Sequence, residues 1–226
     1  MITKTTKCFW LLALLCTGAT DLRAQIRTDI GFRLGANFAN AMPAVVQTES
    51  ERTIVPYTRF LGGPAADFWF SDGCALSLQL LYDQKGVDSR IDRIHFSSDT
   101  AVAPYATTVT TLRLDYLELP AAIHFRSGSS ALKFNFSFGA SVGYLLRAHQ
   151  TISGDTTASG GKFAPFDLSL IAGCGLSYAL AEQRLLYIDA TYAYGITPTS
   201  QSDNYLSSYY ARDFRLTAGM MFPLNF

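Results

Sequence analysis

Residues 132–146 read Leu-Lys-Phe-Asn-Phe-Ser-Phe-Gly-Ala-Ser-Val-Gly-Tyr-Leu-Leu, and this stretch decides the fold. Every even-numbered residue in it is apolar, whereas the odd-numbered residues from Lys133 to Gly143 are charged, polar or glycine. Successive side chains of a β-strand point to opposite faces, so a period of two predicts a strand with one apolar and one polar face.

The same alternation recurs along most of the chain and predicts eight strands. The apolar positions of these segments carry no charge. The predicted strands span residues 30–38, 60–70, 76–82, 112–125, 132–146, 166–178, 186–194 and 214–226. A soluble sandwich turns its apolar face to a core, and an outer-membrane barrel turns it to lipid. Periodicity alone fits both architectures.

The lengths of the connections favour the barrel. Short turns near residues 71–73, 127–130 and 181–183 alternate with longer loops near residues 41–54, 87–106, 148–163 and 197–210. Outer-membrane barrels have short periplasmic turns, long outer loops and aromatic girdles, and aromatic residues gather near the ends of these strands. We therefore predict an all-β, eight-stranded, antiparallel up-and-down transmembrane β-barrel in the cell outer membrane, in contact with its lipid. The terminal Phe226 resembles the signal that the barrel-insertion machinery reads.

The polar face of the strands holds a balanced set of charges, which the barrel would place in its lumen. The predicted lumen network consists of Arg33, Arg59, Asp67, Asp83, Lys85, Arg113, Asp115, Glu118, His124, Lys133, Arg147, Asp167, Asp189, Asp213 and Arg215. Eight strands leave an interior that side chains just fill, and buried charges are costly unless they are paired. We expect the seven cations and seven anions to pair into a polar plug, the alternative being a proton or ion path.

The segment 112–125 contains a change of phase. Leu112, Leu114 and Tyr116 share one parity, and the apolar residues from Leu117 onward share the other. A β-bulge at Tyr116–Leu117 would keep both sets on the outer wall and turn Arg113, Asp115, Glu118 and His124 inward.

Composition and the N-terminus fit an exported membrane protein. Only 16% of the residues are charged, against about 25% in soluble domains, and the net charge of zero gives no basic excess for nucleic acid. Residues 1–24 have a short basic region, an apolar core too short to span a bilayer and a small residue at the end, which is typical of a secretory signal peptide. The outer-membrane β-barrel domain would then be residues 25–226. Removal of 1–24 takes basic residues from 18 to 15 and acidic residues from 18 to 17, which gives a net charge of −2. Cys74 and Cys174 would remain, and we expect two free thiols.

Three short motifs resemble a known family. Asp115-Tyr116-Leu117-Glu118-Leu119-Pro120 is similar to the Tyr-Leu-Glu-aliphatic-Pro signature of PorT-like outer-membrane β-barrel proteins. Residues 31–37 resemble the first strand of that family, and residues 82–86 resemble the end of its third strand. The resemblance implies an eight-stranded barrel in a Gram-negative outer membrane and supplies no catalytic residues. PorT itself belongs to a protein secretion and maturation system, so secretion-system or envelope proteins are the partners that the resemblance implies.

Few residues are candidates for a catalytic, metal or cofactor site. His95 with Ser97 and nearby Asp92 and Asp99 could imitate the rim site of a lipid-modifying enzyme, and His149 opens the next loop, but we interpret them as solvated loop residues. No spacing indicates a metal or cofactor site, so we expect no catalytic, metal or cofactor residues. The leading hypothesis is a structural or partner-binding barrel. A lipid-modifying enzyme and a small-solute channel are the alternatives.

Overall fold

The computed structural model describes residues 27–43, 52–93, 106–128, 131–152, 155–158, 163–180, 184–198 and 209–224. Regular structure in these ranges is β-strand throughout, and none of the described segments is a helix long and apolar enough to cross a membrane. The strands are β1 (Arg27–Pro43), β2 (Arg52–Ser71), β3 (Cys74–Gln79), β4 (Leu81–Arg93), β5 (Ala106–Ser127), β6 (Leu132–Ile152), β7 (Asp155–Ala158), β8 (Phe166–Ala179), β9 (Leu185–Pro198) and β10 (Tyr209–Leu224).

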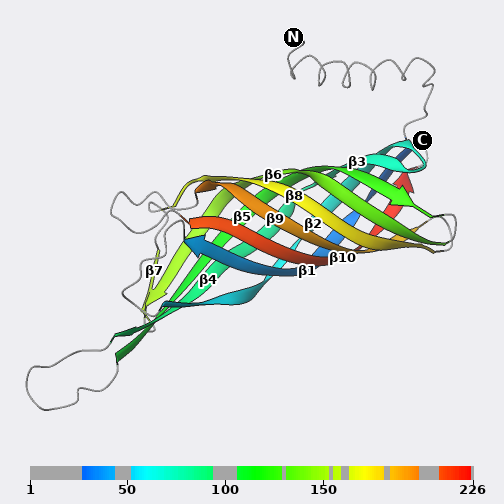
Figure 1. The fold of residues 1–226 in the computed structure, drawn as a ribbon. Coiled ribbons are helices and arrows are strands. Elements are labelled where there is room, and N and C mark those ends of the chain that lie inside the picture. Colours follow the sequence, from blue (N-terminus) through cyan, green and yellow to red (C-terminus); the bar gives the residue numbers. More distant parts are fainter. Residues whose placement is uncertain are drawn as a thin grey trace, which may run out of the picture.

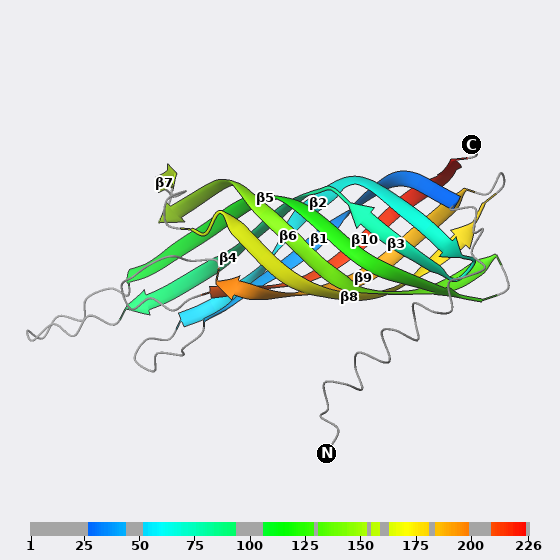
Figure 2. The same cartoon turned by 90° about the horizontal axis from the view of Figure 1, so that it is seen from above.

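The strands close into a ring. Each wall strand pairs antiparallel with its neighbours in the chain, and β1 also pairs with β10 from Thr28–Leu224 to Pro43–Tyr209. Figures 1 and 2 show the resulting tube from two directions. Full closure leaves the middle of the sheet without an open edge. The predicted up-and-down barrel is thereby confirmed.

β3 and β4 together form one wall strand. Ala65 lies opposite Gln79 and Leu61 lies opposite Asp83, so the register against β2 is the same on both sides of the break. Pro64 stands opposite the break and has no N–H to give to the ladder, although its carbonyl accepts the Leu80 N–H at 3.0 Å. β7 pairs only with the end of β6 among the described strands, so eight strands build the wall.

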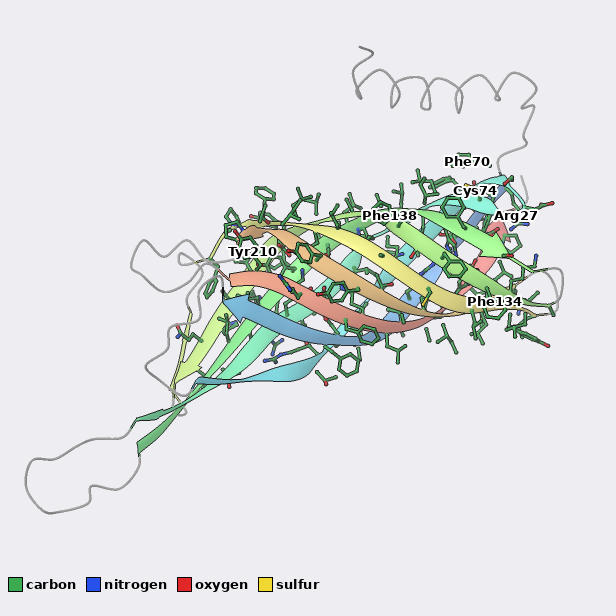
Figure 3. The ribbon with its side chains drawn as sticks, viewed as in Figure 1. Arg27, Phe70, Cys74, Phe134, Phe138 and Tyr210 are labelled. Atoms are coloured by element: carbon green, nitrogen blue, oxygen red, sulfur yellow. The ribbon has the colours of Figure 1, made fainter. Side chains whose placement is uncertain are left out.

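The barrel is apolar outside and polar inside. Phe134, Phe136 and Phe138 on β6 are 58%, 55% and 63% exposed, while Asn135 between them is buried. Figure 3 shows Phe134 and Phe138 projecting from the tube. A soluble protein buries such side chains, so this outer surface is suited to lipid. Its place near the end of a predicted strand makes Trp69 a predicted aromatic girdle residue at the membrane interface, but it is 3% exposed and lies in the lumen.

The predicted bulge at Tyr116–Leu117 is wrong. β5 alternates without interruption, because Leu114 and Tyr116 are buried in the lumen and Leu117 is exposed on the wall. The irregularity lies on β6, where Leu145 pairs with Tyr116 and Arg147 pairs with Asp115, so that Leu146 has no partner. The bulge on β6 turns Arg147 outward.

The two ends of the barrel differ. β2, β5 and β8 end, and β3, β6 and β9 begin, at one end of the barrel, which we call the turn end, and the opposite end is the loop end. At the loop end β4, β5 and β6 continue past the other wall strands, and β7 adds to β6 (Figure 1), while β2 parts from β1 after the pair Ala39–Tyr57 and stays paired with β4. The predicted loops near 87–106 and 148–163 therefore begin as strands, β4 running to Arg93 and β6 to Ile152. The predicted signal peptide 1–24, His95 and Phe226 lie outside the described residues.

Candidate functional site

The loop half of the lumen is crossed by two cations that bridge four carboxylates. Lys85 Nζ lies 2.7 Å from an Asp167 oxygen, 3.2 Å from an Asp213 oxygen and 3.7 Å from a Glu118 oxygen. Arg215 lies 2.8 Å from Glu118, 3.1 Å from Asp83 and 3.3 Å from Asp213. These six residues come from β4, β5, β8 and β10, so their ion pairs join opposite sides of the wall.

Neutral groups add hydrogen bonds to this network. Ser141 donates to Glu118 at 2.7 Å, and the Asn37 amide donates to Asp83 at 2.7 Å. Lys85 also lies over the ring of Tyr116, with Nζ 5.1 Å from the ring centroid. Charged groups in a low-dielectric interior need this density of partners, because each unpaired lone pair or proton is costly. An apolar cap lies next to it toward the loop end and consists of Leu112, Leu114, Tyr116, Leu145, Ala148 and Phe163.

A second cluster fills the turn half of the lumen and is built around Trp69. The Arg126 guanidinium lies 3.9 Å from the centroid of the Trp69 ring, and that of Arg27 lies 5.3 Å from it. The indole N–H of Trp69 donates to Asp29 at 2.8 Å, and Arg126 donates to the Tyr187 hydroxyl. Cation–π stacking and hydrogen bonds thus hold the side chains of this cluster together.

The middle of the lumen is less completely paired. Arg33 donates to Asp189 at 2.7 Å, and the glycine at position 175 leaves room for that carboxylate, which a Cβ there would overlap. Asp67 is fully buried, and neither of its carboxylate oxygens has a hydrogen-bond partner within the described residues. His124 Nε2 is also buried and has no hydrogen-bond partner within the described residues.

A cavity of about 30 Å³ lies between the two clusters. Its lining includes Arg33, His124, Asn135, Asp189 and Arg215. A cavity of this size has room for water, since about 10–15 Å³ of such space is enough for one molecule. The two clusters thus fill the described lumen on either side of this cavity with polar and aromatic side chains.

The structure places most of the predicted lumen residues inside the barrel. Those fully or almost fully buried in the lumen are Arg33, Asp67, Asp83, Lys85, Glu118, His124, Asp167, Asp189, Asp213 and Arg215. Arg59 and Lys133 are half-buried on the same face of their strands, toward the loop end and the turn end respectively.

Three predicted members are not in the lumen. Register pairs Gln84 with Asp115 and Asp115 with Arg147, on the face opposite to Lys85, Leu114 and Tyr116. Arg113 shares this outer face with Asp115 because β5 alternates without a break. The prediction that Arg113, Asp115 and Arg147 point inward rests on the rule that apolar residues mark the outer wall, and this rule does not hold beyond the part of the wall that faces lipid.

Sequence reasoning also missed residues that do line the lumen. Asp29, Trp69, Arg126 and Tyr187 share the parity of their inward neighbours Arg33, Asp67, His124 and Asp189. Trp69 and Tyr187 lie within the predicted strands 60–70 and 186–194, and Asp29 and Arg126 lie one residue beyond the predicted strands 30–38 and 112–125, so the alternation extended by one residue would have found all four. Cys74 and Cys174 are both free thiols, as expected.

The described residues contain no group of three His, Cys, Asp or Glu side chains placed to hold a metal ion. His124 lies inside the lumen beside Trp69 and Tyr187, with ring centroids 5.9 and 5.8 Å away, where a lipid or peptide has no access. The ion pairs and packed aromatic rings in the lumen fill the barrel and make it rigid.

Comparison with known proteins places the chain in a family. No curated protein matches it, but residues 21–201 match the family model of the outer membrane protein beta-barrel domain. Among solved structures, the attachment invasion locus protein Ail of Yersinia pestis is 15% identical, with a TM-score of 0.41 and coverage of 86% of this chain and 98% of that chain. Neisserial surface protein A is 17% identical, with a TM-score of 0.47 and coverage of 85% and 96%. OprG from Pseudomonas aeruginosa is 10% identical, with a TM-score of 0.46 and coverage of 89% and 97%. Because the family model spans well over half of the sequence, this chain belongs to the outer membrane protein beta-barrel domain family and is a protein of the cell outer membrane.

Proposed function

We propose that this protein is a sealed barrel that binds a protein partner through its loop end. The carrying observation is that β2, β4, β5 and β6 continue as a paired sheet beyond the part of the wall where the ring is closed. A chain that needed only to span the membrane has no use for this extension. A structured surface held outside the membrane suits recognition.

The extension also offers backbone groups for pairing. Residues 52–56 of β2 pair with β4, whereas the pairing of β2 with β1 ends at Tyr57 within the described residues. An exposed strand edge presents unpaired N–H and C=O groups, and an extended segment of another protein can add to it as a further strand. We therefore propose an extended segment of an envelope or secretion protein as the partner.

The proposed assignment to a more specific group is based on the motif at residues 115–120 of β5. Asp115-Tyr116-Leu117-Glu118-Leu119-Pro120 supports membership of the PorT-like group, and with it a role as an accessory to protein secretion. In this proposal Glu118 holds the two lumen cations, Tyr116 packs over Lys85, and Asp115 organises the outer wall. The motif thus contributes to both faces of β5.

The partner proposal is tested with a shortened hairpin. In one variant residues 88–111 are replaced by Asn-Gly, which joins β4 to β5 where the extension begins. In the matched control residues 199–208, between β9 and β10, are replaced by Asn-Gly. Both variants should keep the gel shift between unheated and boiled samples. We expect the wild type and the control to co-purify the same partner from detergent-solubilised outer membranes, and the hairpin variant to lose it. Capture of the same partner by the hairpin variant would contradict the proposal.

We also propose that the chain is neither a channel nor an enzyme. The support is the lumen crossed by ion pairs of Lys85 and Arg215 and the burial of His124. Planar-bilayer recordings of the purified protein should show no discrete conductance steps. Replacing His95 and His149 with Ala should leave the mass spectrum of lipid A unchanged. Conductance steps, or a lipid A species that depends on either histidine, would exclude this part of the proposal.

A further inference from the structure

The outer wall carries charge at one level on β4, β5 and β6. Tyr82, Leu117 and Tyr144 lie side by side in the ladder on this outer face, and the exposed Leu146 of the bulge follows Tyr144. The next residues of the outer face toward the loop end are polar or charged. These polar residues are Gln84 on β4, Asp115 and Arg113 on β5, and Arg147 and His149 on β6. The apolar surface that faces lipid chains therefore ends directly below them, at the depth of the headgroups.

Asp115, the acidic residue of this group, accepts hydrogen bonds from its neighbours in the same group. Arg113 donates to Asp115 from Nε at 3.0 Å and from Nη2 at 3.4 Å, and Gln84 donates to the same carboxylate at 3.3 Å. Asp115 is only 2% exposed as a result, whereas the side chain of Arg113 is 42% exposed. The carboxylate thus fixes the guanidinium and is itself withdrawn from the surface.

Arg147 lies next to this pair. It is exposed, and it stands opposite Asp115 in the ladder because the bulge at Leu146 turns it outward. Arg113 and Arg147 give the patch two guanidinium groups against one buried carboxylate, so its exposed surface is cationic. A guanidinium has five N–H donors in a planar fork, which fits the oxygens of a phosphate in a bidentate manner.

Aromatic side chains flank the patch on the side of β8. Tyr144 and Phe166 pair across β6 and β8 with ring centroids 5.5 Å apart, and both are exposed on the wall. Aromatic rings at the membrane interface contact the upper part of acyl chains and the sugar or glycerol region. The guanidinium groups lie on the loop-end side of the apolar belt, and the aromatic rings lie beside them. This arrangement is complementary to an anionic lipid, whose phosphate lies above its acyl chains.

We propose that Arg113 and Arg147 form a binding site for the phosphate of an outer-leaflet lipid, with Asp115 and Gln84 as positioning residues. The ligand class is a phosphorylated glycolipid of the lipid A type, which occupies the leaflet at the loop end of an outer-membrane barrel. The site lies on the outer wall below the extension and is independent of the proposed protein partner.

The experiment measures lipid binding to the purified, folded barrel in a neutral detergent. Native mass spectrometry counts bound diphosphoryl lipid A on the wild type, on Arg147→Gln and on the double variant Arg113→Gln/Arg147→Gln. Arg184→Gln serves as the control, because Arg184 lies at the turn end over Phe222, 6.0 Å from the ring centroid. Phosphatidylcholine and inorganic phosphate are the comparison probes.

We expect the double variant to lose affinity for lipid A by about tenfold or more, and Arg147→Gln to lose part of it. Arg184→Gln should bind as the wild type does, phosphatidylcholine should not distinguish the variants, and excess inorganic phosphate should compete with lipid A. The gel shift between unheated and boiled samples verifies that each variant is folded. Equal lipid A binding by the wild type and the folded double variant, or equal losses with phosphatidylcholine, would overturn the proposal.

Discussion

Arg215 is the residue on which the loop half of the lumen depends most directly. It contacts Asp83, Glu118 and Asp213 between 2.8 and 3.3 Å, and its side chain is 4% exposed. Arg215→Met would fill a similar volume but leave the buried carboxylates without this cation, which costs about 3–5 kcal/mol in comparable buried pairs. We expect a loss of that size in urea unfolding of the barrel in lipid vesicles.

The matched control for Arg215 is Arg212 on the same strand. Arg212 faces the outer wall over Tyr194, 4.7 Å from the ring centroid, with a hydrogen bond at 3.5 Å to its hydroxyl. A surface contact of this kind contributes less than about 1 kcal/mol, so Arg212→Met should unfold close to the wild type. Equal unfolding midpoints for the two variants would contradict a structural role of the lumen ion pairs.

Trp69 reports on which face of the wall is inside. Residues 25–226 contain it as their single tryptophan, and its ring lies in the lumen close to the guanidinium groups of Arg27 and Arg126. Lipids with brominated acyl chains quench a ring that touches them, so we expect the emission of Trp69 to be insensitive to them. In the variant Trp69→Phe/Phe136→Trp the new indole should face lipid and be strongly quenched. Quenching of Trp69 itself would mean that the faces are reversed.

At the scale of the element, the β-bulge on β6 absorbs one residue without changing the rest of the strand. Deletion of Leu146 would leave Leu145 inward and Arg147 outward, paired with Tyr116 and Asp115 as they are now. Deletion of Phe136 instead carries the residues between it and the bulge to the opposite faces, because a slip of one residue inverts a strand. We expect the first deletion to keep the gel shift of a folded barrel and the second to abolish it. Failure of both to fold would show that the bulge itself is required.

The elements also show where sequence reasoning succeeds. From Leu132 to Tyr144 the outer wall meets lipid and the lumen holds polar groups, so polarity reports the face of each residue correctly. Predicted strands and lumen residues in this belt, such as Lys85, Asp167 and Arg215, follow from alternation alone. The free Cys174 on the wall follows in the same way.

The predictions that are wrong concern residues beyond the part of the wall that faces lipid. At Leu112, Leu114 and Tyr116 the lumen is apolar and the outer wall carries Arg113 and Asp115, so the same rule gives the inverted answer. A single chain could not reveal that the extra residue was on β6, since Leu145 and Leu146 are equally apolar. Pairing in the ladder, rather than hydropathy, determines which of two neighbouring leucines is the bulge.

At the scale of the whole molecule, the closed wall predicts which connections a protease can reach and whether the cleaved barrel stays folded. The connection between Arg93 and Ala106 lies at the loop end, and the turn between Ser71 and Cys74 lies at the opposite end. A specific protease site inserted into the first connection should be cleaved in intact cells. The same site inserted at the second should be cleaved only after the outer membrane is opened, because short turns face the periplasm.

The cleaved barrel should nevertheless stay in one piece. β4 remains paired with β2 and β5 remains paired with β6, and the ion pairs of Lys85 and Arg215 still join the two fragments through the lumen. A loop cut leaves these contacts in place and removes only the covalent link between two paired strands. Unheated samples should therefore migrate as one folded species and separate into two fragments on boiling. Separation of the fragments without heating would mean that the hairpin, and not the closed ring with its lumen network, holds the molecule together.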